Sequence, residues 1–239
     1  MPDRRKHRGP HPDDSKLFAL ERVAVIRRAA AEYTWLLSHG YSDRASLKLV
    51  GDHHELNTRQ RLAIWRTACS DSALDSRRSR EVPLDHCSGQ AIGIDGYNVL
   101  VTLESALSGG IVLIGRDGCC RDLAAMHGTY RRVQETIPAV ELIAEHISTL
   151  GVTHVDWYLD RPVSNSGRLK TLMADTLEAR GWLHLFNIEL VDSPDHLLMT
   201  YPGITVTSDG PVLDQCTRWT NLISPLVSNL PNAWVVDLY

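Results

Sequence analysis

The sequence predicts an α/β domain, a parallel sheet flanked by helices, preceded by a small helical N-terminal region. From residue 91 onward, short apolar runs alternate with helical patterns, an alternation typical of βαβ units and a parallel sheet. Several of these runs end in aspartate. Charge also divides the chain, because residues 1–88 hold 16 Lys and Arg against 12 Asp and Glu, whereas residues 89–239 hold 9 against 17. We therefore place a domain boundary near residue 85, between residues 1–85 and 86–239.

The first helix of the N-terminal region follows from apolar spacing. Apolar residues recur at helical intervals and stop at Gly40, which predicts an amphipathic helix over residues 17–38. Residues 41–57 lack this periodicity and predict an irregular segment. Within it, the adjacent His53 and His54 have no surrounding pattern of cysteines or carboxylates, so we interpret them as turn residues rather than metal ligands.

A second helix is expected where a capping pattern begins. Asn57 is followed three residues later by Gln60, which is the spacing of a capping box. The helix that it opens should carry Trp65 inward and Arg66 outward. Residues 70–90 are rich in Ser, Asp and Arg and contain Pro and Gly, which predicts a connection between the two parts of the chain.

The second part of the chain has the pattern of alternating strands and helices. Expected strands cover residues 91–95, 110–114, 155–159, 187–191, 204–207 and 234–238, and expected helices cover 138–150, 168–179 and 212–227. The strands are short and largely apolar, as in a buried parallel sheet. Parallel strands present their carboxyl ends at one edge, where open α/β sheets bind ligands.

Properties of the whole sequence exclude several classes of protein. No run of about 18 apolar residues occurs, so neither a membrane span nor a membrane partner is expected. The N-terminus lacks the apolar core of a secretory signal, and five cysteines without a C-x-x-C pattern predict a reducing, cytoplasmic location. The basic first part suggests a polyanionic partner. The sequence does not fix the oligomeric state and leaves a homo-oligomer open.

Aspartates follow four of the expected strands. They are Asp95, Asp160, Asp192 with the nearby Asp195, and Asp209 with the nearby Asp214. Gathered at one edge, ionised carboxylates repel one another and require compensating positive charge. Mg²⁺ or Mn²⁺ would supply that charge because both ions prefer oxygen ligands, and a pair of such ions can promote phosphodiester hydrolysis. The alternative is that each aspartate only caps the helix that follows it.

Candidate phosphate-binding residues lie near this edge in two groups. The first, after the third expected strand, comprises Arg161, Ser164, Asn165, Ser166, Arg168 and Lys170. Its basic side chains and the amides of a helix N-terminus suit an anion. The second comprises Arg116, Arg121, Arg131 and Arg132 around Tyr130, as in surfaces that bind single strands. A structural role is the alternative for every one of these residues.

Three further acids have two interpretations each. Asp117 and Asp122 could join the metal site or could pair with neighbouring arginines. Glu104 could reach the same edge from the helix that contains Asn98.

Two motifs carry a family resemblance. IDGYNVL and TSDGPVLD resemble the first and last acidic motifs of PIN-like and NYN-like nuclease domains. The resemblance implies a PIN-like α/β fold in which Asp95 and Asn98 supply the first motif and Asp209 the last. Through HRGPHPDDSKLF and LVGDHHELNTRQR, the whole chain also resembles an uncharacterised prokaryotic family whose N-terminal part is domain of unknown function 434.

The resemblance implies a divalent-metal-dependent ribonuclease that hydrolyses RNA phosphodiesters with Mg²⁺ or Mn²⁺. Asp95, Asp160 and Asp209 would be catalytic and would ligate metal, with Asp192 or Asp195 completing the set and Asp214 supporting a second ion. Asn98 would orient the substrate or a metal-bound water. We expect no histidine or lysine to be needed as a general base.

Other activities fit the motifs less well. A haloacid-dehalogenase-like phosphatase would need a second Asp two residues after Asp95, where Tyr97 stands. A dinucleotide-binding enzyme would need G-x-G-x-x-G after the first strand, and GIDGYN lacks it. The main alternative is a non-catalytic RNA-binding module with the same fold. Its basic N-terminal helices would bind the RNA, and loss of the carboxylates would leave binding intact.

Overall fold

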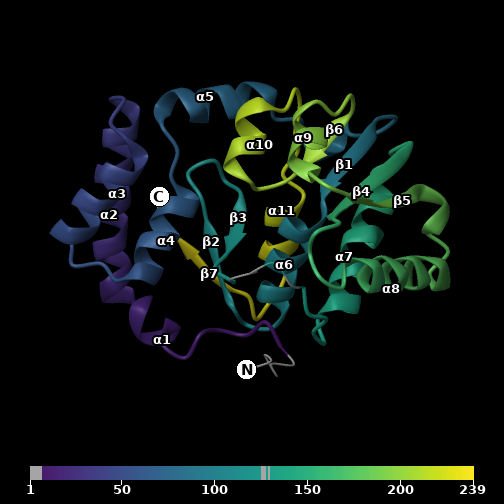
Figure 1. The fold of residues 1–239 in the computed structure, drawn as a ribbon, viewed down its shortest axis with the longest axis horizontal. Helices are drawn as coiled ribbons and strands as arrows, with labels where there is room; N and C mark the ends of the chain where they lie inside the picture. The colour runs from purple at the N-terminus through teal and green to yellow at the C-terminus, as the bar shows by residue number, and fades with distance from the viewer. Residues whose placement is uncertain (1–6, 125–127, 129) are drawn as a thin grey trace.

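The structure is a computed structural model that describes residues 7–124, 128 and 130–239 (Figure 1). The N-terminal region consists of α1 (Asp14–Leu17), α2 (Leu20–Ser38), α3 (Asp43–His53), α4 (Thr58–Thr67), α5 (Asp71–Arg80) and the 3-10 turn η1 (Leu84–His86). The helical character predicted for this region is confirmed. No described helix is both long enough and apolar enough to cross a membrane.

Three local expectations for the N-terminal region can be compared with the structure. The capping box is confirmed, because Asn57 Oδ1 accepts a 2.9 Å hydrogen bond from the Gln60 backbone and Gln60 Oε1 accepts one of 3.2 Å from the Asn57 backbone. The irregular segment expected over residues 41–57 is wrong, since most of it forms α3. The connection expected over 70–90 is wrong in its first half, which forms α5.

The main sheet has four parallel strands in the order β5-β4-β1-β6. They are β1 (Ala91–Asp95), β4 (His154–Asp160), β5 (Phe186–Val191) and β6 (Ile204–Val206). Ile94 at the centre pairs with Trp157 on β4 and Val206 on β6. The predicted parallel sheet is therefore confirmed for β1, β4, β5 and β6. β1 and β4 end at Asp95 and Asp160, and β5 and β6 end just before residues 192 and 207.

Two other expected strands belong to a separate sheet. β2 (Ile111–Ile114) lies between β3 (Cys120–Asp122) and β7 (Trp234–Asp237), parallel to β7 and antiparallel to β3. β3 was not among the expected strands. Side chains of β2 alternate between two cores, because Val112 packs with the main-sheet core while Ile111 and Leu113 pack with the N-terminal helices.

Helices surround the main sheet. They are α6 (Gly96–Leu107), α7 (Thr136–Thr149), α8 (Ser166–Ala179), the 3-10 turn η2 (Leu183–Leu185), α9 (Pro194–Met199), α10 (Gly210–Gln215) and α11 (Ile223–Ser228). The single helix expected over 212–227 is wrong, since residues 216–222 separate α10 from α11. Trp219, within that separation, forms isolated β-bridges with Glu81 and Thr205.

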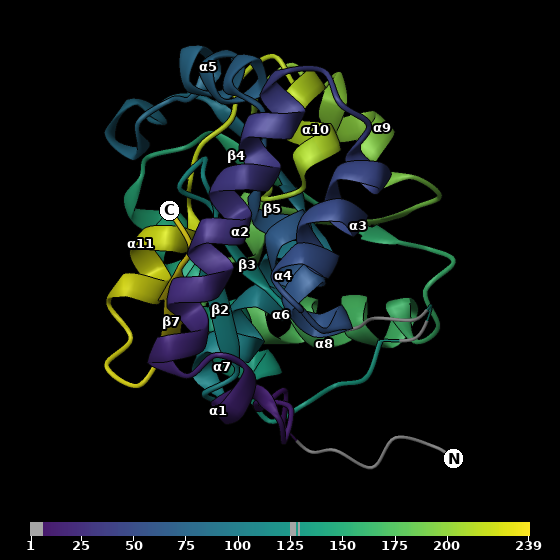
Figure 2. The same cartoon turned by 90° about the vertical axis from the view of Figure 1, so that its left-hand side faces the viewer.

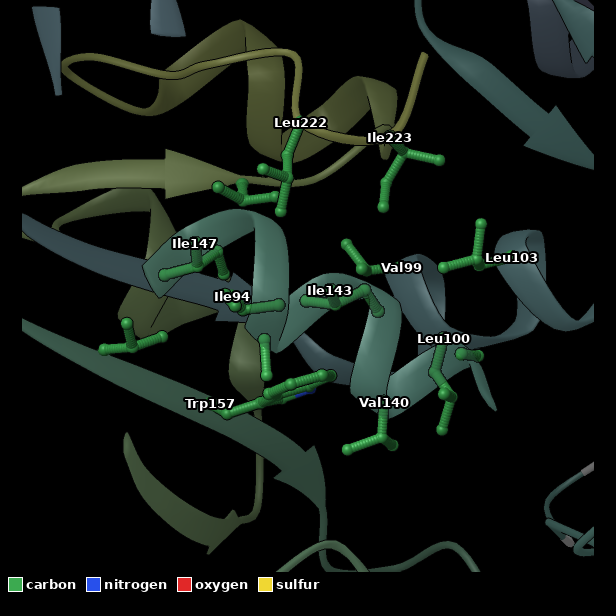
Figure 3. Close-up of a cluster of buried hydrophobic side chains, with 14 of the residues drawn as sticks. Ile94, Val99, Leu100, Leu103, Val140, Ile143, Ile147, Trp157, Leu222 and Ile223 are labelled. Carbon is green, nitrogen blue, oxygen red and sulfur yellow. The ribbon is translucent and has the colours of Figure 1, made fainter. Parts of the chain in front are cut away.

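The main core lies between the sheet and helices α6, α7 and α11 (Figure 3). Ile94 and Trp157 from the sheet pack with Leu100 of α6, Ile143 of α7 and Ile223 of α11 in one buried cluster. This packing fixes the position of β1 and of the turn into α6, and thereby the position of the acid at the end of β1.

A second core joins the N-terminal helices to the rest of the molecule. Ile26 of α2 and Ile64 of α4 are fully buried against Leu113 of β2 and Val236 of β7. Figure 2 shows α2 and α4 lying over the small sheet on this side. At the top of both views, α5, α9 and α10 lie together. The N-terminal region is therefore packed directly onto the elements that follow the acid-ending strands.

Candidate metal and phosphodiester site

A cleft of about 670 Å³ lies at the carboxyl end of β1. One wall comes from the N-terminal helices and includes Trp65 and Arg66 of α4. The other comes from the α/β part and includes Asp95, Asp195 and Asp209. The cleft therefore exists only because the two parts of the chain pack together.

Asp95 is a buried acid of the cleft. It is the last residue of β1, its residue surface is 6% exposed, and the Thr207 hydroxyl donates a 2.7 Å hydrogen bond to its Oδ2. Burial, together with the charges of Asp209, Asp195 and Asp160, raises the pKa of Asp95 to about 7 in spite of the opposing effect of the Thr207 hydrogen bond. The ionised carboxylate of Asp95 is therefore not balanced by nearby positive charge.

The neighbouring acids share this electrostatic environment. Burial and the charge of Asp195 raise the pKa of Asp209, although Arg121, Arg66 and Arg77 partly oppose the rise. Burial and Asp195 likewise raise the pKa of Asp160. The structure therefore brings Asp95, Asp160, Asp195 and Asp209 together as one interacting group, which we call the acid rim.

The two acids after β5 have different positions. Asp195, in the first turn of α9, lines the cleft. Asp192 does not, because its side chain is 76% exposed and its Oδ1 lies 3.5 Å from Arg161 Nη1. Of the alternatives left open by the sequence, Asp195 is the one that belongs to the rim.

The loop between β6 and α10 is held by side chains of the first motif. Asn98 Oδ1 accepts hydrogen bonds from the Ser208 backbone at 2.8 Å and from the Ser208 hydroxyl at 2.9 Å. The Asp209 backbone donates to Thr207 Oγ1 at 3.0 Å. Thr207 and Ser208 were missed by the sequence analysis, although both stand beside the motif aspartate. Asn98 lines the cleft, and its side-chain oxygen positions the loop that carries Asp209.

A buried ion-pair network lies behind the acid rim. Asp117 accepts from Arg77 Nη1 at 2.5 Å and from Arg121 Nη2 at 2.6 Å, while Arg121 Nε donates to the Ser208 carbonyl at 2.8 Å. Burial opposes ionisation of Asp117, but Arg121 and Arg77 outweigh it and lower the pKa of Asp117 to about 2. Arg77 Nε also binds Asp214 Oδ1 at 2.7 Å. Asp117 and Arg121 are therefore structural partners, and Asp214, which lines the cleft, is already paired.

Two residues of α4 form the opposite wall. Trp65 is 49% exposed and its Nε1 donates to Asp43 Oδ2 at 3.3 Å, so the expectation that it points inward is wrong. The Arg66 side chain is 30% exposed and its Nη1 donates to the Asp122 backbone carbonyl at 2.5 Å. Asp122 is buried and accepts from Thr102 Oγ1 at 3.1 Å. It lines the cleft as part of this local network.

The first expected phosphate-binding group does not reach the cleft. Among the described residues that line the cleft, none comes from the segment Arg161, Ser164, Asn165, Ser166, Arg168 and Lys170. Asn165 adopts a left-handed φ of 71° and its Nδ2 donates to the Tyr130 carbonyl at 3.0 Å. The Ser166 hydroxyl donates to the Arg161 carbonyl at 3.3 Å. Asn165 and Ser166 therefore shape the turn into α8, and phosphate binding by this group stays a prediction.

The second expected group is dispersed rather than gathered on one surface. Arg116 Nη2 pairs with Asp71 Oδ1 at 2.5 Å, and Arg121 is buried in the network with Asp117. Arg131 lines a second, smaller cleft, and Arg132 is exposed. Tyr130, at their centre, is only 1% exposed. The expectation of a single-strand binding surface formed by these residues is therefore wrong.

Glu104 lies in the interior, away from the rim. It accepts from the Tyr130 hydroxyl, from Thr136 Oγ1 at 2.6 Å and from Arg8 Nε at 2.7 Å. Burial raises the pKa of Glu104 in spite of these partners. Glu104 thus connects α6 with Tyr130, with the first residue of α7 and with Arg8 near the N-terminus.

The acid rim suits a hard divalent cation in its ligand type and charge. Its side chains offer carboxylate oxygens, which Mg²⁺ and Mn²⁺ prefer, and the raised pKa of Asp95 reflects a shortage of positive charge that a cation would relieve. The oxygens are not tightly clustered. Within the described parts of the chain, three ligand atoms of His, Cys, Asp or Glu lie within 4.8 Å of one another only at Glu32, His53 and His54.

Comparisons with known proteins match two families to successive parts of the chain. The family described as Domain of unknown function (DUF5616) matches residues 84–225, and the family described as Protein of unknown function (DUF434) matches residues 25–80. An uncharacterized protein of Methanocaldococcus jannaschii is 30% identical over 154 residues, which cover 64% of this chain and 74% of that protein. No solved structure matches the chain. The chain therefore belongs to the DUF5616 family, and a DUF434 region precedes the family domain.

Proposed function

We propose that this protein is a divalent-metal-dependent ribonuclease whose PIN-like domain hydrolyses RNA phosphodiesters at the acid rim. The observation that supports this proposal is an electrostatic one. Four acids, Asp95, Asp160, Asp195 and Asp209, interact at the carboxyl edge of one parallel sheet. Three of them, Asp95, Asp195 and Asp209, line the cleft. A site of this kind is where open α/β sheets bind ligands.

In this proposal Asp95, Asp160, Asp195 and Asp209 hold Mg²⁺ or Mn²⁺, directly or through water. When bound, such ions would supply activation of a water and stabilisation of the leaving oxygen of a phosphodiester. Asn98 keeps the loop of Asp209 in place through its contacts with Ser208. The arginines of the buried network, Arg77 and Arg121, reduce repulsion at Asp209.

The opposite wall offers contacts suited to a nucleotide. The exposed face of Trp65 can stack on a base, and the part of the Arg66 guanidinium open to solvent can approach a phosphate. Both residues line the cleft together with the acid rim. These contacts replace the arginine clusters that the sequence analysis assigned to RNA.

A second candidate is an RNA-binding module without turnover. The spacing of the rim acids favours it, because no three of their oxygens approach within 4.8 Å among the described residues. An ion would then be held too loosely for catalysis, while Trp65 and Arg66 would still bind RNA. The two candidates differ in whether the carboxylates are needed for any measurable activity.

The test is cleavage of labelled single-stranded and structured RNA with Mn²⁺ or Mg²⁺, with RNA binding measured on the same samples. Wild type is compared with Asp95→Asn and Asp209→Asn. Asp192→Asn is the matched control, because it removes an exposed acid outside the rim.

Metal-dependent cleavage that is lost in Asp95→Asn and Asp209→Asn but kept in Asp192→Asn, with RNA binding retained throughout, supports the nuclease. RNA binding without cleavage in either metal, unchanged by all three substitutions, contradicts it and supports the binding module. Neither binding nor cleavage contradicts both candidates.

A further inference from the structure

A group of possible metal ligands lies on the N-terminal helices. Glu32 of α2, His53 at the end of α3 and His54 in the C-cap position each offer a ligand atom, and these atoms lie within 4.8 Å of one another. None of the three residues lines the cleft of the acid rim. From sequence the histidines were interpreted as turn residues because no pattern of cysteines or carboxylates surrounds them. Glu32 is 22 positions from His54 and becomes its neighbour only through packing of α2 on α3.

The geometry of this group is close to that of a bound ion. His54 Nε2 lies 2.9 Å from Glu32 Oε2. Ligands of a tetrahedral zinc ion with bonds of about 2.0–2.1 Å stand about 3.3 Å apart. Since all three ligand atoms already lie within 4.8 Å of one another, small side-chain rotations of His53 and Glu32 would close the site.

The contact between His54 and Glu32 is a hydrogen bond within the group, which a bound ion would replace. Asp52, the nearest acid along α3, is already bound by Lys48 Nζ at 2.6 Å and by Arg61 Nη2 at 2.8 Å. His53 and Glu32 are exposed, so an ion can enter from solvent. The site also stands at the carboxyl end of α3, where the helix dipole favours a cation.

We propose that Glu32, His53 and His54 bind a transition-metal ion of the zinc class that ties α2 to the end of α3. Two imidazoles and one carboxylate are a ligand set that zinc uses, with water in the fourth position. Imidazole ligands distinguish this site from the acid rim, whose oxygen ligands suit Mg²⁺ or Mn²⁺. The site stabilises the helical region and does not depend on the proposed nuclease.

The test is a calorimetric titration of the full chain with Zn²⁺, repeated for His53→Ala, His54→Ala and Glu32→Gln. His39→Ala is the control, since His39 stacks on Trp35 and lies outside the group. Asp95→Asn distinguishes Zn²⁺ binding at this site from Zn²⁺ binding at the acid rim.

Co²⁺ absorption provides a second measurement, and circular dichroism establishes that the variants are folded. His53 is exposed, so its substitution should leave the fold intact.

We expect Zn²⁺ affinity to fall at least tenfold in each ligand variant and to stay unchanged in His39→Ala and Asp95→Asn. Zn²⁺ should raise the melting temperature of the wild type but not of His53→Ala. Co²⁺ should give a ligand-field spectrum without a thiolate charge-transfer band. The proposal is overturned if the wild type does not bind Zn²⁺, if His53→Ala and Glu32→Gln bind it like the wild type, or if only Asp95→Asn loses binding.

Discussion

At the scale of single residues, folding disfavours the ionised form of Asp95. It is buried, it receives one side-chain hydrogen bond, and the nearby rim residues are also acidic. Its pKa of about 7 in the folded chain compares with 3.8 for an unperturbed aspartate. Ionisation of Asp95 therefore lowers the free energy of unfolding. This destabilisation is absent below about pH 4, grows as the pH rises, and reaches its full size above about pH 7.

Replacement of this acid by its neutral isostere should stabilise the metal-free protein. We expect Asp95→Asn to raise the free energy of unfolding at pH 8 by a few kcal/mol, with an upper bound of about 4 kcal/mol from the pKa difference. The gain should shrink as the pH falls and should vanish near pH 4. Urea unfolding of both proteins at several pH values measures it, without added metal.

The control for this prediction is Asp192→Asn. The Asp192 side chain is exposed and lies 3.5 Å from the exposed Arg161, so its substitution should change the unfolding free energy little at any pH. A gain in Asp95→Asn that is the same at pH 5 and pH 8 would show that charge burial is not its cause.

At the scale of elements, α5 connects the N-terminal region to the elements around the acid rim through Arg77. Only Leu74 and Arg77 of this helix are buried. Arg77 joins Asp117, Asp214 and the Gly210 carbonyl, so it contacts both the small sheet side and α10. The helix was missed from sequence because it has no apolar stripe, and its main anchor is an ion pair between residues that are 40 positions apart.

Removal of this anchor should destabilise the whole chain. We expect Arg77→Ala to lower the free energy of unfolding by about 3–5 kcal/mol, because it leaves the buried Asp117 with fewer partners. Arg78→Ala removes an exposed arginine from the same helix and should have little effect. Equal thermal stability of the two variants would contradict the role assigned to Arg77.

The turn from β1 into α6 also depends on one residue type. A Cβ on Gly96 would collide with the Tyr158 carbonyl of β4 and with the Leu159 side chain. Backbone cannot move aside easily, so we expect Gly96→Ala to destabilise the fold by about 1–3 kcal/mol. Gly167 in α8 has nothing within 4 Å of such a Cβ, and Gly167→Ala should be neutral or slightly stabilising. Thermal unfolding of the pair tests this, and an unchanged melting temperature in Gly96→Ala would contradict it.

Strands and helices with a clear apolar pattern could be predicted from the sequence. Elements that lack such a pattern could not be predicted. Each strand of the main sheet contains a run rich in apolar residues, and α4 begins at a capping box. By contrast, α3 buries only Ser46, Val50 and Gly51, and β3 has three residues with two buried charges. Neither pattern resembles the usual apolar signal of its element.

At the scale of the whole molecule, the site depends on contacts that are distant in sequence. The edge where Asp95, Asp160 and Asp209 meet could be predicted because parallel strands share one carboxyl edge. The choice of Asp195 over Asp192 could not, since it depends on how α9 begins. The wall formed by Trp65 and Arg66 could not either, because it requires α2 and α4 to pack on the small sheet through the second core.

The central claim is that the acid rim binds a divalent cation. It is tested most directly by a calorimetric titration of Mn²⁺ into the full chain and into Asp195→Asn and Asp192→Asn, two variants that differ by only three positions in sequence. Asp195 lines the cleft and Asp192 does not. We predict that wild type and Asp192→Asn bind Mn²⁺ equally and that Asp195→Asn binds at least tenfold more weakly, about 1.4 kcal/mol. Equal Mn²⁺ affinity in all three proteins would contradict the account.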